Sequence, residues 1–189
     1  MNLFIDTISK LATIILFNNE REIIGSLSWD IKGNESSTLI PQIDKLLKNN
    51  NVIYSGLNNI VVVNGPGSFT GIRTTVLAAN SINYIIKKNM TAISYFDLHS
   101  AYPIIKSSSK RDCFFKQDKN SNIEIISNEN LLNLLNNSGI KKVYGEAETK
   151  LFPDIEIFEK IDYVSIIKQI ELTNVKQISA LYIKKPNIS

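Results

Sequence analysis

The stretch Asn59–Arg73 constrains the fold more than any other part of the sequence. It begins with an unbroken β-branched run, Ile60–Val63, which is typical of a strand covered on both faces. The next residues, Asn64–Gly67, end that strand, because glycine adopts positive φ easily and proline has no N–H to donate to a sheet. Ser68 is a good N-cap and predicts a helix that runs to about Lys88. Free N–H groups at such a helix start form an anion site in many proteins.

The spacing of the glycines excludes two common phosphate-binding motifs. A Walker loop needs Gly-Lys-Ser/Thr, which does not follow Gly67. A dinucleotide fingerprint needs Gly-x-Gly-x-x-Gly, whereas Gly71 lies four residues after Gly67. A bare Gly-x-Gly between a strand and a helix is most often a tight turn, so this spacing alone assigns no ligand.

A longer string that contains this loop resembles the signature of the bacterial TsaB family, and its residues are Gly65, Pro66, Gly67, Ser68, Phe69, Thr70, Gly71, Ile72 and Arg73. Three further stretches are similar to segments of the same family, namely Phe4–Thr7, Leu39–Ile43 and Ala180–Lys184. The resemblance is clear over residues 1–105 and patchy beyond them. At Glu35 the chain departs from the family, which often has a histidine before its Leu-Leu-Pro helix.

The resemblance implies a function that this chain performs with partners. TsaB proteins are non-catalytic paralogues of TsaD and take part in making threonylcarbamoyladenosine in tRNA. The implied role is a scaffold that forms a heterodimer with TsaD, which the ATPase TsaE then joins. ATP and metal are expected on those partner subunits, with no cofactor in this chain. Contact with tRNA is expected to be indirect, and a homodimer is possible when the chain is alone.

Composition is that of an ordinary globular protein. The 189 residues are 43% hydrophobic and 21% charged, and the net charge of +3 is too mild to argue for nucleic acid. Cys113 is the single cysteine, so no internal disulfide can form and a reducing compartment fits. No run of about 18 apolar residues indicates a membrane span. The N-terminus enters a strand pattern containing Asp6, so no signal peptide is expected and the cytoplasm is the predicted location.

The order of predicted elements matches a ribonuclease-H-like lobe over residues 1–105, as found in the actin-like ATPase and sugar-kinase superfamily to which TsaB belongs. Such a lobe is an α/β unit with a mixed sheet and helices on both faces. Five strands and three helices are predicted, at Asn2–Asp6, Leu11–Phe17, Glu22–Trp29, Ser36–Leu47 (helix), Ile60–Val63, Ser68–Lys88 (helix), Thr91–Ser94 and Tyr95–Tyr102 (helix). Pro41 would fit best in the first turn of its helix, or would kink the helix.

A compact second α/β lobe, reduced in size, is expected over residues 106–189, with the boundary near Ile105. Its predicted segments are Arg111–Gln117, Ile123–Ser127, Asn130–Asn136 (helix), Lys142–Tyr144, Ile155–Phe158, Val164–Ile170 and Ile178–Ile183. No internal repeat is evident in the sequence.

Three residues are candidates for chemistry, and none is predicted to be catalytic. Asp6 ends the first strand, where ATP-using relatives hold the magnesium-bound phosphate, but no second phosphate loop is present and Asp6 could equally bond to local N–H groups. His99 is the single histidine, which excludes a His-Glu-x-x-His metal site. Ser68 has no adjacent base. Because of the position of Asp6, the alternative function is a phosphotransferase or ATPase of the same superfamily that uses Asp6 and the glycine loop.

The predicted helix Ser68–Lys88 has a broad apolar stripe. The stripe fits either a crossover helix buried on both sides or a helix that also faces a partner. In the family, this helix and the one at Ser36–Leu47 pack against matching helices of TsaD. The resemblance therefore implies six partner-binding residues, which are Leu39, Ile43, Leu46, Ile72, Val76 and Asn80.

Two points stay open at the level of sequence. Arg73 either locks the glycine loop by bonding to carbonyls or to Asp6, or faces the partner. A third function, RNA binding, would use the basic pairs at 87–88, 110–111, 141–142 and 184–185. These pairs are scattered without interleaved aromatic residues, which is more typical of a solvated surface.

Overall fold

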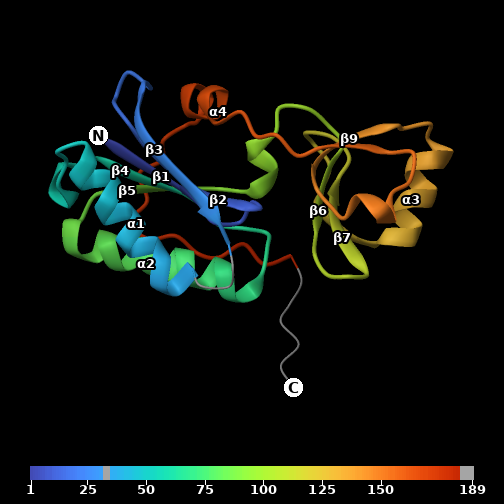
Figure 1. Cartoon of the computed structure of the whole chain (residues 1–189), viewed down its shortest axis with the longest axis horizontal. Helices are drawn as coiled ribbons and strands as arrows, with labels where there is room; N and C mark the ends of the chain where they lie inside the picture. The colour runs from blue at the N-terminus through green and yellow to red at the C-terminus, as the bar shows by residue number, and fades with distance from the viewer. Residues whose placement is uncertain (32–34, 184–189) are drawn as a thin grey trace. The chain divides into compact units, whose positions relative to one another are not determined.

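The computed structural model describes residues 1–31 and 35–183, which form two compact units (Figure 1). The first unit comprises Met1–Tyr95 together with Tyr163–Leu181, and the second comprises Phe96–Asp162 with the described residues after Leu181. The basic pair predicted at 184–185 lies outside the described residues. No helix in the described part of the chain is long and apolar enough to cross a bilayer.

The sheet of the first unit confirms the predicted ribonuclease-H-like order. Its five strands are β1 (Asn2–Asp6), β2 (Leu11–Phe17), β3 (Ile23–Asp30), β4 (Asn59–Val63) and β5 (Asn89–Ile93). They lie in the order β3-β2-β1-β4-β5. The pairs β1–β2 and β2–β3 are antiparallel, whereas β1–β4 and β4–β5 are parallel. Parallel pairs need long crossovers, and the helices in this half of the chain supply them.

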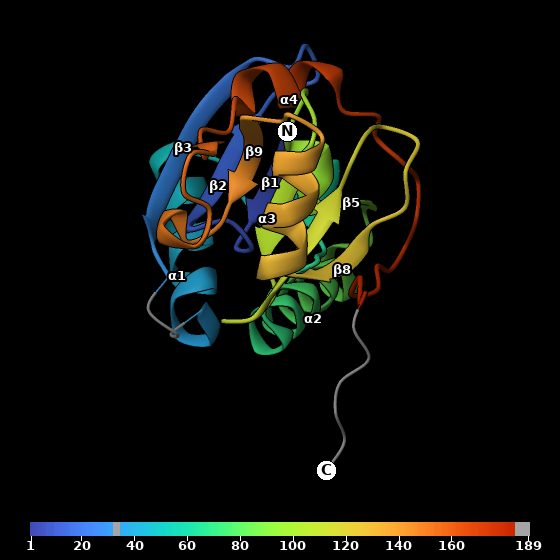
Figure 2. The ribbon, with the colours of Figure 1, turned by 90° about the vertical axis from the view of Figure 1, so that its right-hand side faces the viewer.

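Helices cover both faces of this sheet. Helices α1 (Glu35–Asn49) and α2 (Phe69–Ile86) lie on one face, and α4 (Tyr163–Gln169) lies on the other (Figures 1 and 2). The strand β4 between them is buried along its whole length, as its β-branched run predicts. Pro41 lies inside α1 rather than in its first turn.

The second unit repeats the strand arrangement of the first. Its elements are β6 (Ile104–Ser107), β7 (Asp112–Lys116), β8 (Glu124–Ser127), α3 (Asn128–Asn137), β9 (Lys142–Glu146) and β10 (Glu156–Phe158). The strands lie in the order β8-β7-β6-β9-β10, with two antiparallel pairs followed by two parallel pairs. A helix follows the third strand in each unit. This repeat is invisible in the sequence, and it makes the second unit a reduced α/β lobe as predicted.

Two predicted elements are wrong. The expected helix at Tyr95–Tyr102 is a 3₁₀ turn at Tyr95–Leu98, because Pro103 disfavours helical backbone at the residue before it and β6 begins immediately afterwards. The segment Ile178–Ile183, placed in the second lobe, does not form a named strand. Most of it belongs to the first unit.

The division between the units also differs from the expected boundary near Ile105, because Ile105 lies in the middle of strand β6. The chain leaves the first unit at Tyr95 and returns to it at Tyr163. After α4, the return segment Thr173–Leu181 runs along the first unit. Its backbone bonds to β5, where Met90 N donates to Val175 O over 2.9 Å.

Four asparagine side chains hold this return segment by its backbone carbonyls. Each Nδ2 group donates one hydrogen bond: Asn59 to Thr173 O (3.0 Å), Asn64 to Ser179 O (2.8 Å), Asn80 to Ile178 O (2.9 Å) and Asn83 to Lys176 O (2.9 Å). The acceptors are backbone carbonyls, so these hydrogen bonds do not depend on which side chains the segment carries. The return segment is thus held within the first unit.

Candidate functional site

The loop between β4 and α2 has two glycines that leave no room for a side chain. Gly65 has a φ of +133°, and a Cβ there would lie 2.5 Å from Leu181 O in the return segment. A Cβ at Gly67 would lie 2.8 Å from Ile8 Cγ2, just after β1. Real side chains do not tolerate such distances to backbone, and the φ of Gly65 favours glycine independently. The glycines therefore allow β4, β1 and the return segment to meet.

The same loop fixes the start of α2. Ser68 is the N-cap, as predicted, and its Oγ accepts a hydrogen bond from Gly71 N at 3.1 Å. Thr75 Oγ1 donates to Gly71 O at 3.0 Å and also bonds to the hydroxyl of Thr7 after β1. Gly65 O accepts from Tyr95 N at 2.7 Å. Through these contacts the motif positions the start of α2. Within the motif, Pro66 and Gly71 are buried and Thr70 is exposed.

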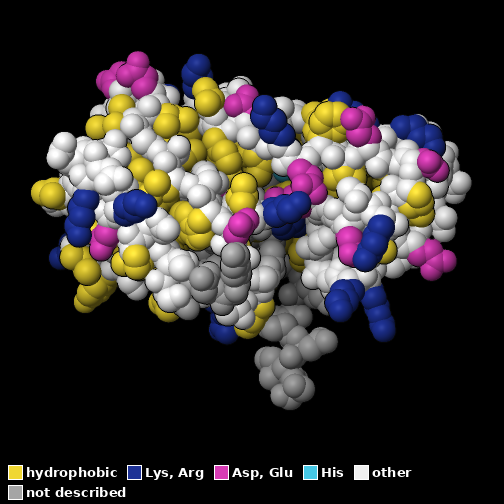
Figure 3. Space-filling view, viewed as in Figure 1, with side chains coloured by type: hydrophobic (Ala, Val, Ile, Leu, Met, Phe, Trp, Pro, Cys, Tyr) yellow, Lys and Arg dark blue, Asp and Glu magenta, His cyan; other side chains and the backbone are white. Residues whose placement is uncertain are grey.

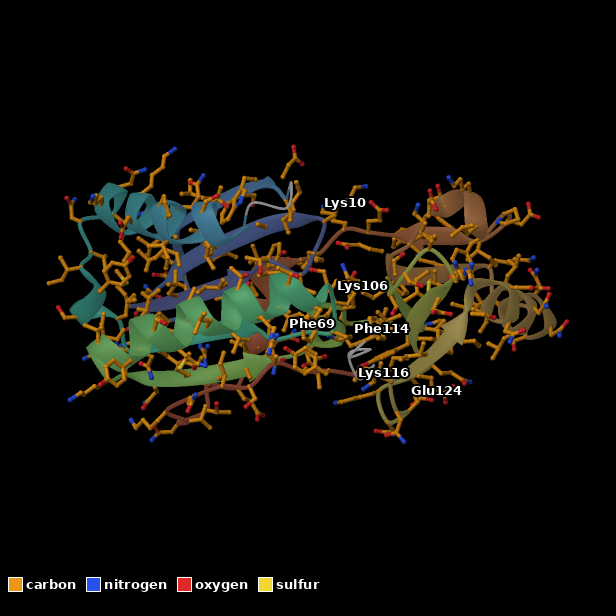
Figure 4. All side chains as sticks on the ribbon, turned by 90° about the horizontal axis from the view of Figure 1, so that it is seen from below. Lys10, Phe69, Lys106, Phe114, Lys116 and Glu124 are labelled. Atoms are coloured by element: carbon orange, nitrogen blue, oxygen red, sulfur yellow. The ribbon has the colours of Figure 1, made fainter. Side chains whose placement is uncertain are left out.

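Arg73 lies one helical turn into α2 and stacks on Phe69. Its guanidinium carbon lies 4.5 Å from the centroid of the Phe69 ring. Phe69 is at the N-terminal end of the helix (Figure 4). Among the residues that the structure describes, Arg73 bonds neither to Asp6 nor to a loop carbonyl. Its side chain is exposed, and Phe69 is 40% exposed. Of the two roles that the sequence left open for Arg73, the arrangement favours one at the surface.

Asp6 is fully buried, and its carboxylate accepts four hydrogen bonds. Ile8 N and Ser9 N donate to Oδ1 at 2.8 and 3.1 Å, and Ser9 Oγ and Tyr163 Oη donate to Oδ2 at 2.6 and 2.7 Å. The interpretation that Asp6 bonds to local N–H groups is confirmed. Burial, and secondly the charge of Asp6, raise the pKa of Tyr163 far above its usual range, so its hydroxyl remains a donor.

Tyr163 is a partner of Asp6 that the sequence did not reveal. It lies 157 residues further along the chain, at the start of α4, and its ring meets Phe4 of β1 edge-on at 5.7 Å. No local spacing links the two positions. All four donors to the two oxygens of the Asp6 carboxylate are groups of this protein, so the carboxylate has a structural role.

His99 and Cys113 are both uncharged at neutral pH. Burial, together with the charge of Lys106, lowers the pKa of His99 to about 4, so its imidazole is neutral. Burial raises the pKa of Cys113 to about 11, and its thiol donates to Asn128 Oδ1 at 3.2 Å within the core of the second unit. Across residues 1–31 and 35–183, no group of three or more His, Cys, Asp or Glu residues could hold a metal ion.

The six predicted partner-binding residues point into the first unit rather than out of it. The side chains of Leu39, Ile43, Leu46, Ile72 and Val76 are between 0% and 8% exposed. Asn80 holds the return segment, because its Nδ2 donates to Ile178 O and its Oδ1 accepts from Ile178 N at 3.1 Å. The choice of residues is therefore corrected: the apolar periodicity marks the face of each helix that packs against its own unit.

The outward sides of α1 and α2 form an apolar groove, here called the α1–α2 groove. It has a volume of about 630 Å³, and its lining includes Ile40, Leu77, Ala78, Ser81, Ile82 and Ile85. Large apolar side chains are exposed along it, with Ile40 37%, Leu77 68% and Ile85 79% accessible. Hydrophobic side chains are visible at the surface in this part of the molecule (Figure 3). A surface of this kind is typical of a protein–protein interaction site.

Comparison with known proteins finds similarity to TsaD and to TsaB proteins over part of the chain. The family model of TsaD, tRNA N6-adenosine threonylcarbamoyltransferase, matches residues 31–112. The tRNA threonylcarbamoyladenosine biosynthesis protein TsaB of Buchnera aphidicola is 32% identical over 92 residues, covering 49% of this chain and 43% of the relative. The chain spans between 34% and 52% of the length of three other TsaB proteins that it matches, so these similarities cover about half of each relative or less.

Two similarities extend over the whole chain. An uncharacterised Mycoplasma pneumoniae protein, a homologue of MG208, is 25% identical over 198 residues and is covered to 95%. A solved structure of an uncharacterised protein with similarity to the peptidase YeaZ from Pseudomonas aeruginosa superposes with a TM-score of 0.70 at 14% identity, over 97% of this chain and 99% of the other. The latter likeness concerns the fold, which is the actin-like, ribonuclease-H-like arrangement of two α/β lobes.

Proposed function

We propose that the chain is a member of the TsaB family and acts as a non-catalytic scaffold subunit in the biosynthesis of threonylcarbamoyladenosine in tRNA. It forms a heterodimer with TsaD and thereby supports transfer of a threonylcarbamoyl group to the adenosine next to the anticodon. The single observation that carries the proposal is the exposed α1–α2 groove in a chain whose one candidate catalytic carboxylate is committed to the fold.

The surroundings of Asp6 support a non-catalytic role. A carboxylate that holds a magnesium-bound phosphate must offer free lone pairs to the metal or its water. The two oxygens of Asp6 instead accept four hydrogen bonds from protein groups, and the side chain is fully buried. The alternative of a phosphotransferase that uses Asp6 and the glycine loop is correspondingly weakened. ATP and metal belong to the partner subunits in this proposal.

The α1–α2 groove supports docking through two helices. Exposed Leu77 and Ile85 lie two turns apart on α2, and Ile40 lies across from them on α1. A partner that lays an amphipathic helix or helix pair into the groove would remove these apolar side chains from water. The residues that carry docking in this proposal are thus Ile40, Leu77 and Ile85, rather than the six residues that the sequence suggested, of which five are buried.

The motif loop has a positioning role in this proposal. The contacts of Ser68, Gly71 and Thr75 fix the N-terminal turn of α2. This helix supplies most of the residues that line the groove. TsaE joins once the heterodimer has formed, and contact with tRNA is indirect. When TsaD is absent, the same groove is available to a second copy of the chain.

Light scattering after size-exclusion chromatography tests the proposal with the TsaD of the same organism. The wild-type chain and TsaD should elute together at the summed mass. Leu77→Glu and Ile85→Glu place a charge in the groove and should each weaken the complex at least tenfold, because burying an unpaired carboxylate is costly. Both side chains are exposed, so the monomer should stay folded.

Tyr84→Glu is the matched control for this experiment. Tyr84 is also on α2 and is 83% exposed, but it does not line the groove. It should bind TsaD with the affinity of the wild type. No complex between folded wild-type chain and folded TsaD would overturn the proposed function, whereas binding that survives both groove substitutions would overturn the docking surface alone.

A further inference from the structure

The α1–α2 groove contains one charged side chain among the residues that line it. This is Asp44, which is half-buried one turn after Ile40 on α1. Every other lining residue is apolar or carries only a hydroxyl group, and no lysine or arginine belongs to the lining. A lone carboxylate on an otherwise apolar docking surface is a feature that a partner has to match.

Tyr54 holds this carboxylate in place. Tyr54 Oη donates to Asp44 Oδ1 at 2.6 Å from the 3₁₀ turn Tyr54–Gly56, which lies beside the groove. Burial, and secondly the hydrogen bond and charge of Asp44, raise the pKa of Tyr54 well above its usual range, so the hydroxyl stays a donor. No described residue donates a hydrogen bond to the second carboxylate oxygen. Asp44 is thus oriented but only partly satisfied.

We propose that the helix which fills the groove carries a lysine or arginine that pairs with Asp44, an inference that rests on the proposed function. Docking removes the half-buried carboxylate from water, and a buried charge without a counter-charge is strongly unfavourable. A cation at this level supplies both the counter-charge and the donor for the free oxygen. An arginine would suit the site well, because its guanidinium is weakly hydrated.

Asp44 also disfavours a second copy of this chain as the occupant. Two copies docked groove to groove would bury two carboxylates, and the lining residues would bring no cation to either of them. Like charges on a shared interface reject the wrong partner while an opposite charge favours the right one. One side chain therefore selects a heterologous helical partner with a basic residue over self-association.

Asp44→Asn tests the inference because it removes the charge and keeps an oxygen that can accept from Tyr54. Titration calorimetry with TsaD should give a dissociation constant at least tenfold larger than that of the wild type. Sedimentation equilibrium of the chain alone should show the opposite change, with self-association at least tenfold stronger in the variant. Lys45→Gln is the control, because Lys45 is exposed on the same helix outside the groove lining, and it should change neither constant more than about twofold.

The TsaD titration and the self-association measurement distinguish failure of this inference from failure of the proposed function. A wild-type complex whose affinity does not depend on Asp44 would overturn this inference and leave the proposed function intact. If the wild type forms no complex, the proposed function fails, and the self-association arm still decides the role of the charge. Self-association that is unchanged or weaker in Asp44→Asn would overturn the selection against a second copy.

Discussion

Asp6 and Tyr163 form a buried polar pair within the first unit. The Asp6 carboxylate lies at the end of β1, and Tyr163 Oη lies 2.7 Å from its Oδ2. Together with Ile8 N, Ser9 N and Ser9 Oγ, this hydroxyl fills the hydrogen-bonding capacity of the buried group. The pair also joins the start of α4 to the central strands of the first sheet, so one polar contact serves the packing of distant segments.

Tyr163→Phe should destabilise the chain by about 1–3 kcal/mol, because a buried carboxylate oxygen loses one of its donors and no water replaces it without a rearrangement. Urea unfolding followed by circular dichroism measures the change in free energy. Tyr84→Phe is the control, since Tyr84 is 83% exposed and should change the stability by less than about 0.5 kcal/mol. Equal stability of the Tyr163→Phe and wild-type chains would show that the hydrogen bond contributes nothing.

At the scale of elements, α2 makes three sets of contacts with different faces. Its buried face packs in the first unit through Ile72, Val76 and Ala79. A second face holds the return segment through Asn80 and Asn83, and the third lines the α1–α2 groove with Leu77 and Ile85. A helix covered on two sides and apolar on the third has the broad stripe that the sequence shows.

Asn80→Leu should loosen the return segment, because it removes the donor to Ile178 O and the acceptor from Ile178 N. Loss of two partly buried hydrogen bonds should lower the free energy of unfolding by about 1–3 kcal/mol. Hydrogen exchange should become faster at the amides of Lys176–Leu181. Ser81→Ala on the same helix changes an exposed side chain and should leave both measurements unaltered; faster exchange in this control would point to a general effect of α2.

The elements could be predicted from sequence where one local pattern determines them. The β-branched run of β4 and the cap at Ser68 each identify an element within a few residues. The sequence could not predict which face of α1 and α2 packs within the unit, because periodicity does not distinguish packing within a unit from packing against a partner. The resemblance implied that these two helices bind a partner, which stays a prediction, whereas Leu39 and Ile72 proved to be core residues.

Contacts between distant segments were beyond the sequence for a different reason. The partners of Asp6, Asn64 and Asn80 in the return segment and α4 lie roughly 100 residues or more away, and asparagine or tyrosine at those positions has no local consequence. The structural repeat of the second unit likewise has no sequence signal, because only the strand order is shared.

For the whole molecule, the chain path makes the first unit discontinuous. Residues from Tyr163 onward complete that unit, after Phe96–Asp162 has formed the second. A simple cut at Ile105 would sever β6 and would also leave the first unit without α4 and the return segment. The stretch of the chain that resembles the family most clearly is therefore not an autonomous folding unit.

A protein in which residues 96–162 are replaced by a flexible Gly/Ser linker of about 15 residues should fold cooperatively, because it retains every contact within the first unit. The fragment 1–105 should be far less stable, since it leaves the side-chain amides of Asn59, Asn64, Asn80 and Asn83 without the carbonyls they bind and exposes Met90. Circular dichroism during thermal unfolding compares the two. A cooperative transition of fragment 1–105 at the temperature of the linked protein would show that α4 and the return segment add no stability.

The linked protein also retains the α1–α2 groove, so it should bind TsaD unless residues of the second unit contribute to docking.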